Sequence, residues 1–143
     1  MRNRTLSREI ALKILYSWEI SAETITLCAK KYWDNNKLEE ETVVAFCEYL
    51  LKGVDKYKIE LDEKIAKAAL NWTISRMSCI DRNILRIASF ELLFTIDIPD
   101  KVTINEAINL AKKYGDKDSG RFVNGVLDKV KTYGKISGVF QSE

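Results

Sequence analysis

Apolar residues recur every three or four positions over most of the chain, and this spacing is the period of an α-helix. Short polar segments separate the periodic stretches, the clearest being Asp34–Lys37. The stretches cover roughly 5–18, 23–33, 39–56, 61–72, 81–97, 103–114 and 118–133. No segment shows the two-residue alternation of a half-buried β-strand. The pattern therefore predicts an all-α protein of about seven helices.

The segment 58–61 divides the predicted helices into a group of three and a group of four. At 143 residues, with 46% hydrophobic and 31% charged residues, the chain has the size and composition of one globular domain. Six glycines and one proline disfavour a turn-rich β fold. We therefore expect a single domain, 1–143, of two small packed bundles at about 1–58 and 59–135, followed by a flexible tail at 136–143.

The segment 102–129 carries the clearest helix start and stop signals. Thr103 and Glu106 have the T-x-x-E spacing of a capping box, and Gly115 follows as a C-terminal stop. The next helix starts at about residue 118, and Lys117 and Arg121 flank this start. Backbone donors at a helix N-terminus between two cations can bind an anion, although many surface helix starts share this arrangement by chance.

Charge is unevenly distributed, although the formal net charge is only +2. Residues 1–13 carry four cations and one carboxylate, and residues 112–135 carry seven cations and three carboxylates. Residues 34–63 carry nine carboxylates and four lysines. A basic and an acidic surface result if the fold brings the chain ends together, with the first helix packed close to the last; scattered solvated charge is the alternative.

The sequence offers little for catalysis. It contains no histidine, no nucleophile–base pair and no phosphate-binding glycine pattern, so we expect neither an enzyme nor a cofactor or metal. Glu91 and Glu106 lie in otherwise apolar helices and need partners if they are buried. We expect Arg86, or Asn105 and Asn124, to supply them.

The three cysteines, Cys28, Cys47 and Cys79, lack metal-ligand spacing and are expected to be buried free thiols of a reducing compartment. The most apolar stretch, Ile84–Ile96, contains Arg86 and is too short to span a bilayer. We therefore expect a cytoplasmic protein without membrane association.

Four separated segments carry a family resemblance. INEAINLAKKYG followed by RFVNGVLDK, together with ALKILYSWEIS and IDRNILRIASFELL before the Ile98–Pro99 turn, closely resembles the NusB family of bacterial transcription antitermination factors. The four segments occur in the right order and spacing over nearly the whole chain. The resemblance implies binding of a boxA-type single-stranded RNA together with the ribosomal protein NusE in the transcription elongation complex, notably on ribosomal RNA operons, with no DNA contact expected.

The resemblance also implies which residues bind. The basic N-terminus and the start of the last helix would hold the RNA through Arg2, Arg4, Arg8 and Tyr16, and through Lys117, Asp118, Arg121, Phe122 and Asn124. In this set cations would neutralise phosphates and an aromatic ring would stack on a base. Phe122 lies at the margin of its helix's apolar face, so it is either the edge of the core or a stacking platform. Asp81 and Arg82 are the expected contacts to NusE.

The sequence departs from the family at one place, and two alternative functions are open. Thr5 and Leu6 stand where the family often has arginines, which bears on RNA affinity. One alternative function is a helical protein–protein adaptor without RNA binding. Another is a NusB-like RNA-binding module of the kind fused to RNA cytosine methyltransferases, although we expect no cofactor-binding domain in a chain that ends at Glu143.

Overall fold

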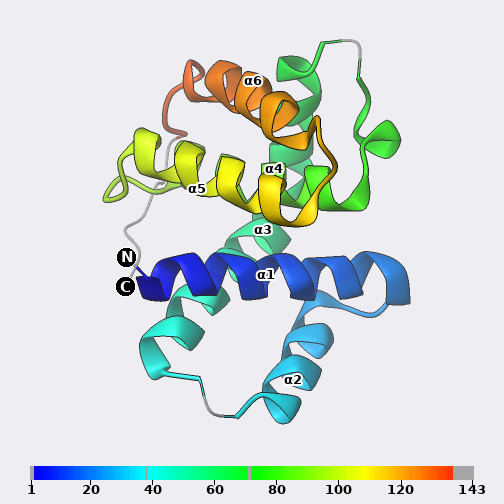
Figure 1. Cartoon of the computed structure of the whole chain (residues 1–143), viewed down its shortest axis with the longest axis vertical. Helices are drawn as coiled ribbons and strands as arrows, with labels where there is room; N and C mark the ends of the chain where they lie inside the picture. Colours follow the sequence, from blue (N-terminus) through cyan, green and yellow to red (C-terminus); the bar gives the residue numbers. More distant parts are fainter. Residues whose placement is uncertain (1, 38, 71, 137–143) are drawn as a thin grey trace.

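The computed structural model describes residues 2–37, 39–70 and 72–136. Over these ranges it has six α-helices, one short 3-10 helix and no strand, so the all-α prediction is confirmed although seven helices were expected (Figure 1). The elements are α1 (Arg2–Ser21), α2 (Ile25–Asn35), α3 (Glu41–Ala68), η1 (Ile74–Arg76), α4 (Cys79–Phe94), α5 (Asp100–Tyr114) and α6 (Ser119–Lys131).

The difference in helix number comes from α3, which joins the third and fourth predicted helices into one. The chain bends at Tyr57, where φ is −109° and ψ is 19°, and then continues as helix. No glycine or proline follows to stop it, and Leu61 and Ile65 continue the buried stripe that includes Val54. The expected boundary at 58–61 is therefore a bend within a helix.

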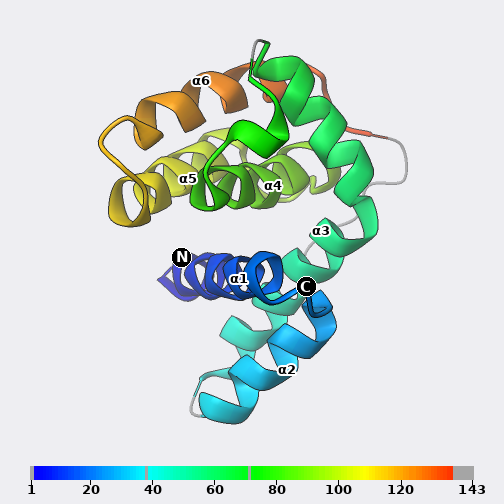
Figure 2. The ribbon, with the colours of Figure 1, turned by 90° about the vertical axis from the view of Figure 1, so that its right-hand side faces the viewer.

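The molecule consists of two bundles that share α3. The first half of α3 lies with α1 and α2, and its second half lies with α4, α5 and α6 (Figure 2). The predicted tail at 136–143 falls almost wholly outside the described residues. Its first residue, Ile136, packs on the core, and its backbone N–H donates to the carbonyl of Leu93 at 2.8 Å.

The first and last helices do not pack together as expected. The main packing partners of α1 are α3, α4 and α2, and α5 lies between α1 and α6 in both views. The reason is that α6 turns its apolar stripe, Val123, Val126, Leu127 and Val130, into the second bundle.

Aromatic rings fill the contact between α3 and α4. Tyr57 stacks on Phe94 with ring centroids 4.1 Å apart, and Phe94 stacks on Phe90 at 5.8 Å. Gly53 lies against Phe90 so closely that a side-chain carbon at position 53 would be 2.1 Å from the Phe90 ring. The close approach of the two helices therefore depends on a residue without a side chain.

The predicted capping box is wrong. α5 begins at Asp100, directly after Pro99, so Thr103 lies inside the helix rather than before it. Its hydroxyl donates to Glu91 at 2.9 Å, and Glu106 faces Arg8. The T-x-x-E pattern here marks an inward-facing polar pair on α5.

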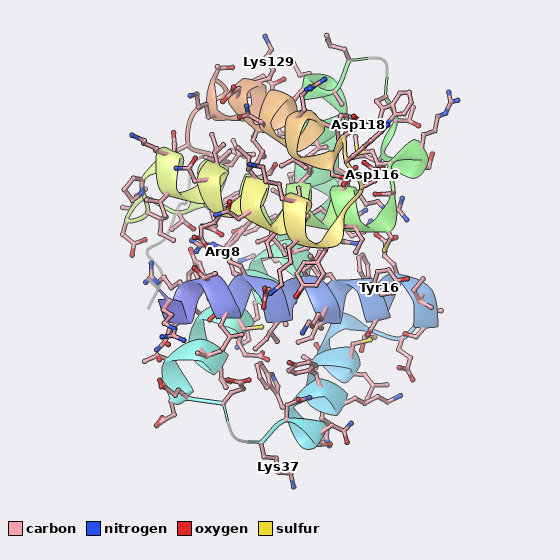
Figure 3. All side chains as sticks on the ribbon, in the orientation of Figure 1. Arg8, Tyr16, Lys37, Asp116, Asp118 and Lys129 are labelled. Atoms are coloured by element: carbon pink, nitrogen blue, oxygen red, sulfur yellow. The ribbon has the colours of Figure 1, made fainter. Side chains whose placement is uncertain are left out.

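A buried ion pair connects α1 to the second bundle. The Arg8 guanidinium donates to Glu91 through Nε at 2.8 Å and Nη2 at 2.7 Å, and reaches Glu106 at 3.4 Å. Figure 3 shows Arg8 pointing from α1 toward α5. Arg8 and Thr103 are thus the partners of Glu91, and the expected partners Arg86, Asn105 and Asn124 are wrong.

A second polar cluster holds the other end of α1. Glu19 accepts from Nε of Arg82 at 2.8 Å and from the Asn83 amide at 3.0 Å, and it forms an ion pair with Arg86. Arg86 also donates to Asp62 of α3 at 2.8 Å. The cluster therefore joins α1, α3 and α4 at one point.

Glu19 makes stability depend on pH. Burial opposes its ionisation, but hydrogen bonds from Arg82 and Arg86 outweigh burial and lower the pKa of Glu19 from 4.5 to about 2. A carboxylate with a lowered folded-state pKa stabilises the protein above its unfolded pKa, and this contribution is lost as pH falls toward the folded pKa. We expect Glu19→Gln to be less stable than the wild type near neutral pH, with the difference shrinking between about pH 4.5 and 2 in urea melts. A difference that stays constant over this range would contradict the assignment.

Candidate nucleic-acid interface

The exposed side of α1 carries part of the predicted RNA-binding set. Arg2 is exposed, and Tyr16 keeps 44% of its surface exposed. Lys13, which is not in the predicted set, is exposed on the same helix. Arg4 is half-buried, with its guanidinium carbon 4.5 Å from the centroid of the Phe46 ring. These residues offer cations and one aromatic ring along a single helix.

Arg8 does not belong to this exposed side. It is 2% exposed, and its donors bind Glu91 and Glu106. An RNA phosphate could reach it only by breaking a buried ion pair. The structure therefore gives Arg8 a role in holding the bundles together and places it away from the surface where RNA would bind.

The loop between α5 and α6 brings the second part of the predicted set near the C-terminal half of α1. Lys113 of α5 forms an ion pair with Glu9 of α1, which fixes the end of α5 over α1. Lys117, Arg121 and Asn124 follow and are exposed. Figure 3 shows Tyr16 on the side of α1 that faces this loop.

The N-terminal arginines lie farther away. Arg4 and Tyr16 are separated by 12 residues of α1, which is about 18 Å at 1.5 Å per residue. Both groups can therefore contact one ligand only if that ligand runs along α1. An extended single strand of several nucleotides has the required length.

The loop at the start of α6 is organised by carboxylates. Oδ1 of Asp116 accepts from the backbone N–H of Asp118 at 2.8 Å, and the buried hydroxyl of Ser119 accepts from the Asp116 N–H at 3.0 Å. A side-chain carbon at Gly115 would lie 2.4 Å from this hydroxyl, so the tight turn requires glycine. Asp116 and Asp118 place two negative charges at the helix start, and these charges disfavour an anion at its backbone donors.

Phe122 combines the two interpretations offered for it. Its ring packs against the hydrophobic core and is only partly buried. Its remaining surface lines a pocket of about 540 Å³ between this loop and the connection from α3 to α4. Phe122 is therefore an edge residue of the core with one side available to a ligand.

The two predicted partner contacts are less accessible than expected. Asp81 is 9% exposed, in the first turn of α4, where its backbone N–H donates to Ser78. The Arg82 guanidinium is bound to Glu19 and to the carbonyl of Met77. Asp81 reaches a ligand only through the pocket that it lines with Phe122, and Arg82 supports the fold.

Two residues of this pocket were not predicted as surface residues. Trp72 is the last residue of the predicted helical stretch 61–72, but α3 ends at Ala68 and leaves Trp72 45% exposed. Leu70 is 80% exposed and adopts a left-handed backbone conformation with φ of 56°. Since Leu61, Ile65, Ala68 and Trp72 follow helical spacing, periodicity alone could not have located the helix end.

Two further classes of site are absent from the described residues. None of their helices has the length and apolar character needed to cross a membrane. Nor do their cysteine and carboxylate side chains form a cluster suited to a metal ion.

Two bundles sharing α3, with cations and an exposed tyrosine along α1, define a small all-helical domain with a candidate nucleic-acid surface. The chain belongs to the NusB family, whose model matches residues 5–132, and this confirms the resemblance seen in the sequence. It is 48% identical over 127 residues to the transcription antitermination protein NusB of Anaeromyxobacter dehalogenans, and the match covers 89% of each chain.

Solved structures agree with this membership. NusB of T. maritima superposes with a TM-score of 0.85 at 33% identity, covering 92% of each chain. A crystal structure of the antitermination factors NusB and NusE in complex with dsRNA superposes with a TM-score of 0.85 at 27% identity. That match covers 93% of this chain and 98% of the other.

Proposed function

We propose that this protein is a transcription antitermination factor that binds a boxA-type single-stranded RNA together with NusE and so promotes processive transcription, notably of ribosomal RNA operons. Membership of the NusB family supports the antitermination role. The solved complex of a NusB with NusE and dsRNA supports NusE and RNA as partners.

One juxtaposition carries the RNA-binding proposal. The ion pair between Glu9 and Lys113 holds α5 against α1, and this places Tyr16 on the side of α1 nearest the loop that carries Lys117. Cations beside a half-exposed ring suit a single strand, because phosphates bind the cations while an unpaired base stacks on the ring. A duplex, with its bases paired, leaves no face for such stacking.

The proposed path of the RNA runs along α1. Arg2 and Arg4 contact phosphates at one end, and Tyr16, Lys117 and Arg121 contact the strand at the other. Asn124 lies one turn beyond Arg121 on α6 and offers an amide to a base or sugar. Asp118 and Phe122 border this path at the pocket.

We expect Arg2→Ala with Arg4→Ala to weaken binding of boxA-type RNA and to reduce the slope of log affinity against log salt by about 1.4. Each phosphate contact of a single strand contributes about 0.7 to this slope. The double variant Lys37→Ala with Lys129→Ala is the matched control, because it removes the same charge from the two ends of the molecule far from α1 (Figure 3). Fluorescence titrations at several salt concentrations measure the RNA affinity and its salt dependence for the two double variants.

The same titrations separate the alternatives. An equal slope in the α1 variant and the control would mean that the N-terminal arginines do not touch RNA. If the wild type binds neither the single strand nor its duplex, but binds NusE, the protein is a protein–protein adaptor.

A further inference from the structure

We infer that the pocket between the α3–α4 connection and the start of α6 is a receptor for an arginine side chain of a basic protein partner. Its walls come from three parts of the chain: Ala69, Leu70 and Trp72 after α3, Asp81 in α4, and Asp116, Asp118 and Phe122 at the α6 start. The inference rests on the proposed function in taking NusE as that partner.

The negative charge of the pocket favours a positively charged ligand. Three of the described residues that line it are aspartates, and none of these described residues is a lysine or an arginine. Phosphates are therefore repelled at this point, although cations lie on the exposed side of α6 nearby. Asp118 borders both the negatively charged pocket and the proposed RNA path, and the charged RNA contacts on that path are cations.

Asp81 gives a second reason, independent of the net charge of the pocket, to expect a cation or donor there. It is 9% exposed, and its Oδ1 is buried without a hydrogen-bond partner among the described residues. A buried carboxylate without full pairing is costly, and an approaching cation or donor relieves that cost. Burial raises the pKa of Asp81, as does the nearby Asp116, against the opposing effect of the Ser119 hydroxyl.

The apolar walls favour arginine over lysine. Trp72 is 45% exposed and Leu70 is 80% exposed, so both stand beside the carboxylates at the surface. The guanidinium carbon of this chain's Arg76 lies 5.7 Å from the centroid of the Trp72 ring, so the ring already packs with one guanidinium group. A guanidinium group is planar: it stacks on an aromatic ring and pairs with carboxylates through several N–H donors at once. A lysine ammonium group would pair with the carboxylates, but it has no planar face to stack on the aromatic ring.

An RNA base is the competing occupant, because it also stacks on Trp72 or Phe122. A base carries no positive charge to offset three aspartates, and its phosphates would lie close to them. The observations therefore favour a protein side chain.

The test measures NusE affinity by calorimetry for the folded full-length chain. Trp72→Ala and Asp118→Asn each alter the pocket, and the Asp118 side chain makes no capping hydrogen bond that the change would remove. The matched controls are Ile59→Ala, an exposed apolar residue of α3, and Asp128→Asn, an exposed carboxylate of α6. Asp81→Lys is avoided, because a lysine at a buried site would disturb folding.

We expect the NusE Kd to rise about tenfold in each pocket variant and to stay within about twofold in each control. Acetyl-arginine amide should shift the Trp72 indole N–H resonance of the wild type, and the uncharged acetyl-citrulline amide should not. Unchanged NusE affinity in both pocket variants would overturn the inference and leave the proposed function standing.

Two other outcomes are decisive. If the wild type binds RNA but not NusE, the proposed partner is wrong, and the arginine probe then decides: a shift at Trp72 supports the pocket, and no shift overturns it. If Trp72→Ala lowers RNA affinity in the absence of NusE, the pocket holds a base and the inference is overturned.

Discussion

Replacing Arg8 with alanine should lower the free energy of unfolding by about 3–5 kcal/mol. The Glu91 carboxylate is 1% exposed in the wild type, and after the change the Thr103 hydroxyl is its one remaining side-chain partner among the described residues. Removing one partner of a buried ion pair is strongly destabilising because the other charge stays buried. Urea denaturation of the variant and the wild type measures the loss.

The double variant Arg8→Met with Glu91→Met is the control for this interpretation. It removes both charges and fills the site with apolar side chains, so it should recover most of the loss. A loss below about 1 kcal/mol for Arg8→Ala would mean that water reaches Glu91, and would contradict the burial seen here.

Replacing Gly53 with alanine should also destabilise the protein, by about 2–3 kcal/mol. In an ordinary helix interior the same change stabilises by about 1 kcal/mol. Here the added carbon would lie 2.1–2.4 Å from three atoms of the Phe90 ring. Phe90 is 1% exposed and is held between Tyr49 and Phe94, so its ring has no space to move into.

Gly125 in α6 offers a matched comparison. A side-chain carbon there meets nothing within 4 Å, so Gly125→Ala should stabilise the protein by up to about 1 kcal/mol. Thermal melts of the two variants should therefore shift in opposite directions. A stabilising Gly53→Ala would show that α3 and α4 can separate without loss of packing.

The sequence predicted the helical segments because their apolar residues recur with a clear period. It failed at 58–61, where the predicted division between two helices is a bend within α3, because no glycine or proline stops the helix there. It failed again at Thr103, because the T-x-x-E spacing of a cap also places two polar side chains on one side of a helix. The better start signal was Pro99 followed by Asp100.

The burial of Arg8 could have been inferred in part. Arg8, Ala11, Leu15 and Glu19 lie three, four and four residues apart, so both charged residues fall on the inner side of α1. Their partners could not be inferred, because Glu91 is 83 positions away in the chain. For the same reason, the pocket that joins Trp72 to Phe122 is visible only in the fold.

α1 is fixed to α4 at two points, Arg8 near its start and Glu19 near its end, about 16 Å apart along the helix axis. The exposed side of the helix is therefore held in one conformation before any ligand arrives. For a strand lying along it, the loss of conformational entropy on binding falls on the RNA rather than on the protein. The entropy of binding should then grow more unfavourable with the number of nucleotides ordered, while the heat-capacity change carries no contribution from folding of the protein on binding.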